Sequence, residues 1–242
     1  MSISTQLFNG PISGEFHQLQ EKIQQNNIVS RVLNHDFSVW MDNPKEISNR
    51  LDWLDSPIEM SEKIPEILRF VDNARKDGIE KALLLGMGGS SLAPEVFATT
   101  FGTKTDFLEL HILDSTVPEA IMEKATSFDP AKTIYITSTK SGDTVETISL
   151  LNFFYNAAVE KLGIKNTGKH FTAITDPDSD LFRLAKTLDF RHTFVNNANI
   201  GGRYSALSHF GLVPAAMIGC NIESLLYRVK KELTNTTPAI EL

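Results

Sequence analysis

The chain has 242 residues but only one cysteine, Cys220, which excludes an intramolecular disulfide and is typical of proteins from a reducing compartment. Because the neighbours of Cys220 are apolar, we expect a buried, inert thiol. No hydrophobic run approaches the length of a membrane span, which argues against a membrane protein. Residues 1–6 lack the basic and apolar regions of a signal peptide, so we expect the cytoplasm.

An excess of basic residues is also missing. The chain has 23 Lys and Arg against 30 Asp and Glu, a formal net charge of -7, which argues against nucleic acid or an acidic membrane as the main partner. An anionic substrate stays possible, because helix dipoles and a few cations govern its binding locally. Hydrophobic residues at 41% and charged residues at 22% fit a globular protein with a real core.

The first third of the chain predicts helices and no strand. One helix is expected around residues 17–28, a second segment from Pro44, and a third helix from about Pro57 to Asp77, with Gly78 as its stop signal. We therefore expect residues 1–78 to form a helical layer that packs on the core. The polar tail, residues 234–242, predicts a linker or frayed terminus.

From Lys81 onward, short apolar runs alternate with segments of helical period. The runs are residues 81–86, 108–113, 133–137, 170–175 and 190–195. This alternation predicts an α/β domain over residues 79–233, a doubly wound parallel sheet of about five strands with helices on both faces. Ligands of such sheets bind beyond the carboxyl ends of the strands, and the glycine- and hydroxyl-rich segments fall at those ends.

The sequence TSTKSGDTVET at residues 137–147 follows one of these runs and leads into a helix. The first turn of a helix offers unpaired N–H groups and a positive dipole end, which is a common phosphate site. Hydroxyls of Thr139, Ser141 and Thr144 could add donors, and Lys140 a cation. Ordinary capping by hydroxyl residues is the alternative. We expect the awkward carboxylate of Asp143 to serve as the helix N-cap.

Two further motifs follow predicted strands. GMGGSS at residues 86–91 lets the backbone approach a ligand closely, but it lacks both the third glycine of a dinucleotide fingerprint and the Lys of a Walker loop. A small anion therefore suits it better than a nucleotide. GGRYSALS at residues 201–208 could direct the Arg203 guanidinium into a cleft, the alternative being a surface salt bridge. We interpret the following His209 as a structural histidine with satisfied hydrogen bonds.

Together these motifs resemble the phosphoglucose isomerase family, whose domains have the sugar isomerase (SIS) fold. The resemblance rests on GMGGSSLAP at 86–94, TKSGDTVET at 139–147 and GGRYSALS at 201–208, and covers residues 40–232 approximately. RLDWLD at 50–55 looks closest to the isomerase portion of bifunctional transaldolase–phosphoglucose isomerase proteins. Asp143, Ser91 and Ala93 depart from the family pattern.

The resemblance implies glucose-6-phosphate isomerase activity, an aldose–ketose isomerisation through an enediolate, without metal or organic cofactor. It implies that Thr139, Ser141 and Thr144 hold the phosphate with help from the backbone at Lys140. Gly89 and Ser90 would line the sugar, and Arg203 would stabilise the enediolate.

The same resemblance implies that the catalytic glutamate, histidine and lysine come from a second SIS domain, which this sequence lacks. We therefore expect a first-half domain that binds glucose 6-phosphate or fructose 6-phosphate weakly and has little turnover alone, within an enzyme that is a homodimer when complete. A stand-alone SIS module that senses sugar phosphates is the alternative, and a nucleotide-binding domain is a third. The sequence does not decide the oligomeric state or the sugar specificity.

Overall fold

The computed structural model describes residues 13–240 of the chain. The prediction from residues 1–6 and the last two residues of the predicted tail lie outside the described residues. Contacts divide the chain into two compact units, residues 49–229 and residues 1–48 together with 230–242. No helix of the described part is long and apolar enough to cross a membrane.

The larger unit is built on a five-stranded sheet in the order β2-β1-β3-β4-β5, with every neighbouring pair parallel. The strands are β1 (Lys81–Gly86), β2 (Glu109–Leu113), β3 (Thr133–Ser138), β4 (Phe171–Thr175) and β5 (His192–Val195). All five lie on the predicted apolar runs, within two residues at each end. The predicted doubly wound α/β class is therefore confirmed.

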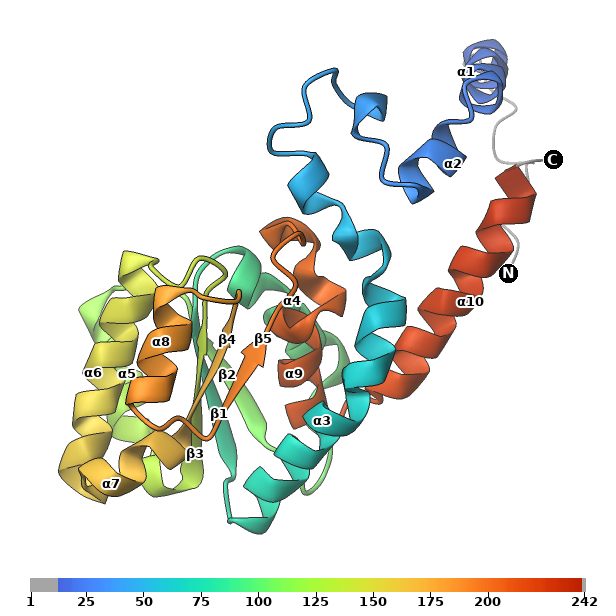
Figure 1. Cartoon of the computed structure of the whole chain (residues 1–242). Helices are drawn as coiled ribbons and strands as arrows, with labels where there is room; N and C mark the ends of the chain where they lie inside the picture. Colours follow the sequence, from blue (N-terminus) through green and yellow to red (C-terminus); the bar gives the residue numbers. More distant parts are fainter. Residues whose placement is uncertain (1–12, 241–242) are drawn as a thin grey trace. The chain divides into compact units, whose positions relative to one another are not determined.

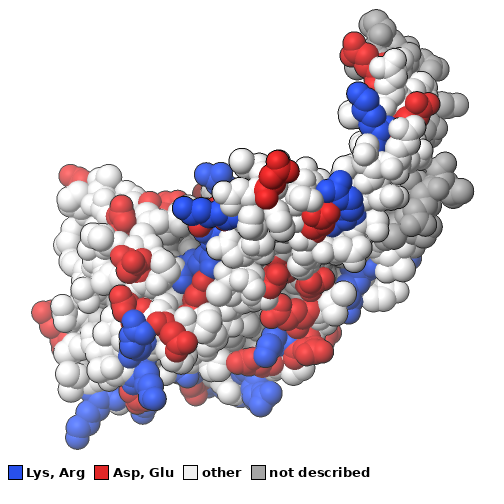
Figure 2. Space-filling view, turned by 45° about the horizontal axis from the view of Figure 1, so that its top comes forward, with Lys and Arg blue, Asp and Glu red and all other residues white. Residues whose placement is uncertain are grey.

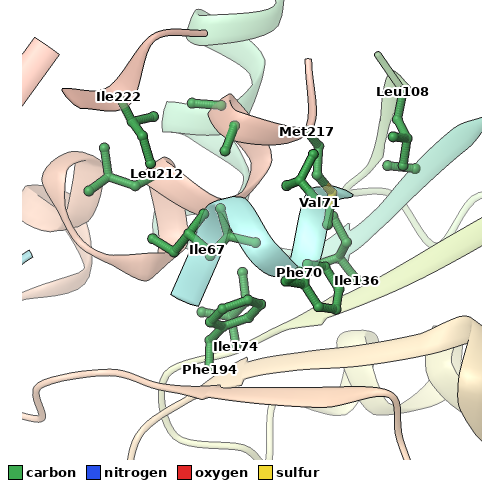
Figure 3. Close-up of a cluster of buried hydrophobic side chains, with 14 of the residues drawn as sticks. Ile67, Phe70, Val71, Leu108, Ile136, Ile174, Phe194, Leu212, Met217 and Ile222 are labelled. Atoms are coloured by element: carbon green, nitrogen blue, oxygen red, sulfur yellow. The ribbon is translucent and has the colours of Figure 1, made fainter. Parts of the chain in front are cut away.

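Helices cover both faces of the sheet, and alternate residues of each strand divide between two cores. One core joins the sheet to α3 (Ser56–Lys76), α9 (His209–Met217) and the start of α10 (Ile222–Ile240). Figure 3 shows Ile67 and Val71 of α3 packed with Ile136, Ile174 and Phe194 from the strands in this core. α4 (Gly89–Phe101) adds partly buried Phe97 to it.

The second core lies on the opposite face of the sheet. It contains α5 (Pro118–Ser127), α6 (Val145–Leu162) and α8 (Asp180–Thr187), which Figure 1 shows together on one side of the strands. Short helices α7 (Ile164–Thr167), η5 (Pro130–Lys132) and η6 (Gly168–His170) lead into strands β3 and β4. Because both faces are covered, central strand β3 is buried along its whole length, which explains its continuous apolar run.

The N-terminal third differs from expectation in detail. The helix expected around residues 17–28 is two helices, α1 (Ser13–Gln25) and α2 (Ile28–Leu33), because Asn27 adopts a positive φ of 50° between them. Short 3₁₀ turns follow, η2 (Phe37–Val39), η3 (Ser48–Arg50) and η4 (Asp52–Leu54). The predicted stop at Gly78 is confirmed, since its φ is +79° just beyond the end of α3.

The division of the chain also differs from the predicted boundaries. α3 belongs to the unit of residues 49–229, so the boundary lies near residue 48 rather than 78. Helix α10 continues to Ile240 through most of the segment that we expected to be a linker. A polar segment occurs in helices as well as in linkers, so composition alone did not distinguish the two.

Candidate functional site

A pocket of about 450 Å³ opens at the carboxyl end of the sheet, within the unit of residues 49–229. Loops that follow β1, β3, β4 and β5 all contribute to it. Its lining residues are Arg50, Met87, Gly89, Ser90, Thr139, Lys140, Ser141, Thr144, Asp176 and Gly202. Figure 2 turns this end of the sheet toward the viewer and shows basic and acidic side chains interspersed over the surface. The pocket thus lies where parallel sheets place their ligands.

The structure brings six of the seven predicted site residues together around this pocket. They are Gly89, Ser90, Thr139, Lys140, Ser141 and Thr144. Arg203 is the exception: its neighbour Gly202 lines the pocket, whereas Arg203 is exposed and its side chain makes no hydrogen bond or ion pair with any described residue.

The β3–α6 loop presents a run of unpaired backbone donors. Thr139 N donates to Ile174 O at 3.1 Å, and the next backbone amide that donates is that of Ile148, to Thr144 O at 3.0 Å. Within the described chain, no hydrogen bond uses the N–H groups of residues 140–147. They precede and begin the 18-residue helix α6, so the positive end of its dipole adds to them. An anion is the natural acceptor for such a group of donors.

Capping of α6 corrects the expectation for Asp143. The N-cap is Thr144, and its hydroxyl lies 2.9 Å from the Thr139 hydroxyl instead of bonding the first turn. Asp143 is exposed and caps nothing. The positive φ of Gly142, +81°, reverses the chain just before the exposed Asp143, whose carboxylate is not among the groups that line the pocket.

The Lys140 ammonium is engaged by its surroundings. It forms an ion pair with Asp176 Oδ2 in the β4–α8 loop and donates to Ala198 O at 2.6 Å in the loop after β5. Burial raises the pKa of the Asp176 carboxyl above its ordinary value, while the neighbouring Lys140 acts in the opposite direction. The side-chain cation that we predicted beside the anion is thus already neutralised.

Two segments of the pocket are in direct contact: the glycine loop, residues 86–91, and the arginine loop, residues 196–208 between β5 and α9. A Cβ on Gly89 would lie 2.6 Å from Gly202 O, so only glycine permits this approach. Ser205 Oγ donates to Gly202 O at 2.8 Å and lies 3.4 Å from Gly89 O. The N-terminus of α4 is thereby joined to η7 (Gly202–Leu207), the segment that carries Arg203.

Residues 50–53 fasten the arginine loop from the other side. Leu51 forms an isolated antiparallel bridge with Ile200, and Asp52 Oδ2 accepts hydrogen bonds from Asn197 and Asn199 side chains, each at 3.1 Å. The Trp53 ring stacks on Tyr204, with centroids 5.3 Å apart. These contacts explain why the RLDWLD stretch occurs together with the other three motifs: it supports the segment that carries Arg203.

Sequence reasoning missed two charged residues of the pocket, Arg50 and Asp176. Asp176 directly follows β4, so the rule that places ligands at strand ends could have found it. Arg50 precedes the sheet and lies at the pocket beside the loop after β5, where Gly201 N donates to Arg50 O at 3.4 Å. No local pattern signals that contact.

Two expectations near the site need correction. His209 is buried, but neither ring nitrogen has a hydrogen-bond partner among the described residues, so it is not the satisfied histidine that we expected. Burial lowers the pKa of His209 to about 4, which keeps the ring neutral at physiological pH. Cys220 is partly rather than fully buried, and burial raises the pKa of its thiol. Residues 13–240 contain no cluster of three or more side chains suited to a metal.

Comparison with known proteins identifies the family. The family model for phosphoglucose isomerase matches residues 42–233. The chain belongs to the phosphoglucose isomerase family. It is 32% identical over 186 residues to a glucose-6-phosphate isomerase of Thermus thermophilus, covering 77% of this chain and 43% of that protein. Identity is also 32% over 168 residues to the Campylobacter jejuni enzyme, covering 69% of this chain and 40% of the relative.

Solved structures share the fold. A hypothetical protein of Thermus thermophilus aligns with a TM-score of 0.74 and 28% identity over 90% of this chain and 48% of that chain. A glucose-6-phosphate isomerase of Chlamydia trachomatis aligns with a TM-score of 0.65 at 18% identity, over 87% of this chain and 43% of that one, which supports the fold alone. The chain therefore spans less than half the length of these relatives.

Proposed function

We propose that this chain supplies the sugar-phosphate-binding half of a glucose-6-phosphate isomerase. The observation that carries the proposal is the set of unpaired N–H groups of Lys140, Ser141 and Thr144, which line a pocket that Thr139 also lines. Donors to a charged acceptor form strong hydrogen bonds, and these donors need no reorganisation to receive a phosphate. Gly89 and Ser90, across the pocket, would contact the sugar.

Isomerisation moves a proton between C1 and C2 through an enediolate, which needs a base and a cation near the developing negative charge. We assign the cation to Arg203, whose exposed side chain would turn toward a bound sugar. Among the described residues that line the pocket, Asp176 is the only carboxylate, and it is paired with Lys140. We therefore propose that the base and the ring-opening acid belong to a second SIS domain.

The family supports further parts of this proposal. The chemistry is proton transfer, for which no metal or organic cofactor is required. We propose that the complete enzyme is a homodimer and acts in the cytoplasm. The regulatory alternative, a SIS module that only senses sugar phosphates, would not need Arg203 above the sugar, so the arginine motif favours the enzyme.

Calorimetry with fructose 6-phosphate tests the binding site. Replacing both Ser141 and Thr144 by alanine should weaken binding by about 1–3 kcal/mol, because two donors to a charged acceptor are lost. Ser149→Ala is the matched control, since Ser149 is a hydroxyl residue further along α6 and outside this pocket. Unchanged affinity of the double variant would show that the phosphate does not bind at this loop.

Two further measurements separate the alternatives. Thermal stabilisation by NAD or ATP but not by fructose 6-phosphate would favour a nucleotide-binding domain. We expect the purified chain to show little or no isomerase turnover in a coupled assay. Ordinary turnover by this chain would contradict the proposal that the base and the acid belong to a second SIS domain. If a second SIS domain is added and the sugar phosphate binds but is still not isomerised, the alternative of a sugar-phosphate sensor is favoured.

A further inference from the structure

The Lys140 side chain connects three loops at the carboxyl end of the sheet. Its ammonium contacts Asp176 Oδ2 and donates to Ala198 O at 2.6 Å. The main chain of the same residue is also tied, since Asp176 N donates to Lys140 O at 3.1 Å. Lys140 thus links the β3–α6 loop to the loops that follow β4 and β5.

This ion pair is largely shielded from solvent. The side chains of Lys140 and Asp176 are 23% and 14% exposed. Asp176 Oδ1 is buried and has no hydrogen-bond partner among the described residues. The Lys140 ammonium at Oδ2 is the first of the groups that favour the charged carboxylate, ahead of the side chains of Asn196 and Arg50. Breaking such a pair from one side leaves an uncompensated charge, whereas replacing both partners by apolar residues is often tolerated.

The other contacts of the β3–α6 loop involve its Thr139 amide, the hydroxyls of Thr139 and Thr144, and Gly142, where a Cβ would meet Ser179 at 2.7 Å. The N–H groups of residues 140–147 bond no described residue, and Gly142 holds a left-handed conformation at φ +81°. Because these amides bond no other described residue, their positions depend on the other contacts that hold the loop. The Lys140–Asp176 pair, together with the bond to Ala198 O, lies at the beginning of this segment.

We propose that Lys140 and Asp176 form a clamp that positions the backbone donors of residues 140–147, and that the Lys140 ammonium does not itself bind the phosphate. Asp176 is then a positioning residue of the site. The inference rests on the proposed function, because it concerns the same phosphate pocket. It assigns the affinity for phosphate to preorganised amides and hydroxyls rather than to a free lysine charge.

A double-mutant cycle tests the clamp, with Lys140→Met, Asp176→Leu and the combined variant, each titrated with fructose 6-phosphate where circular dichroism shows it folded. The clamp predicts that each single variant raises Kd about 10-fold and that the combined variant binds within about 3-fold of the unchanged chain. Direct phosphate binding by Lys140 predicts the opposite sign for Asp176→Leu, which would free the cation and tighten binding. It also predicts a combined variant no better than Lys140→Met. Either result would overturn the clamp.

Lys132→Met is the matched control. Lys132 pairs with Glu80 at 2.7 Å, but both side chains are more than half exposed and lie away from the pocket. Its removal should leave Kd unchanged, which separates loss of the clamp from loss of overall positive charge. If a single variant does not fold, the combined variant still tests the clamp, because the clamp predicts that the combined variant binds fructose 6-phosphate.

Failure of the proposed function gives a different result. If the unchanged chain does not bind fructose 6-phosphate, the proposed function is contradicted, and the clamp is judged by thermal melting. A melting temperature lowered by both single substitutions and restored in the combined variant would support it. Additive losses would overturn it.

Discussion

The β3–α6 loop and the arginine loop lie at the same edge of the sheet, but they are prepared for a ligand to different degrees. In the first, unpaired backbone donors follow Thr139, whose amide is fixed to Ile174 O of β4, and Lys140 is held by Asp176. In the second, η7 is fastened through Ser205 and residues 50–53, but the Arg203 side chain is exposed and engages no described residue.

The difference follows from which atoms carry the chemistry. Backbone donors have the direction of the chain itself, so contacts that hold the loop, such as the proposed Lys140–Asp176 clamp, also fix the donors. A guanidinium at the end of a long side chain has several rotamers, and its direction needs a ligand or another surface to fix it. We therefore expect phosphate binding from this chain alone and catalysis only where a second surface closes over Arg203.

The largest expected effect concerns Arg203. Arg203→Ala should reduce turnover about 100-fold in a protein that contains both SIS domains, because the enediolate loses its cation, while the Kd of fructose 6-phosphate changes little. Steady-state kinetics and calorimetry measure the two quantities. A matching loss in Kd would mean that Arg203 binds the phosphate instead, and unimpaired turnover would remove it from the mechanism.

The contact between the two loops gives the next effect. Gly89→Ala should destabilise the protein by about 2–3 kcal/mol and weaken sugar-phosphate binding, since a Cβ there would lie 2.6 Å from Gly202 O. Gly202→Ala is the control, because a Cβ at Gly202 meets nothing within 4 Å and its φ is not positive. Urea unfolding measures both. Equal stability of the two variants would show that the loops move apart freely.

The smallest effect tests the support behind the arginine loop, where buried His209 begins α9. The folded pKa of about 4 is below the ordinary 6.5, so the unfolded chain takes up the proton first and stability falls as pH drops from about 6.5 to 4. Between pH 7 and 5 this loss should be about 1–2 kcal/mol. His209→Leu should remove it, as urea unfolding at both pH values would show. An unchanged pH dependence in the variant would assign the acid sensitivity elsewhere.

Much of the fold was predictable because its signals are local. The centres of the apolar runs, such as residues 82–85 and 134–136, are apolar throughout, since strands covered on both faces bury nearly every side chain. The helix end at Gly78 and the loops formed by the glycine- and hydroxyl-rich motifs could also be predicted, because helix ends and strand ends favour particular residue types. These motifs also placed six site residues around one pocket.

The chain's sequence by itself determined the parallel sheet, the alternation of helices and the position of the loop that we propose binds an anion, because each depends on the periodicity or conformational freedom of nearby residues. Only the tertiary structure decided that Lys140 pairs with Asp176, 36 residues away, and that Arg50 reaches the pocket. It also decided that His209 is buried with no hydrogen-bond partner in the described part of the chain. Such contacts join segments that chain folding brings together, and no pattern along the sequence encodes which long side chain meets which loop.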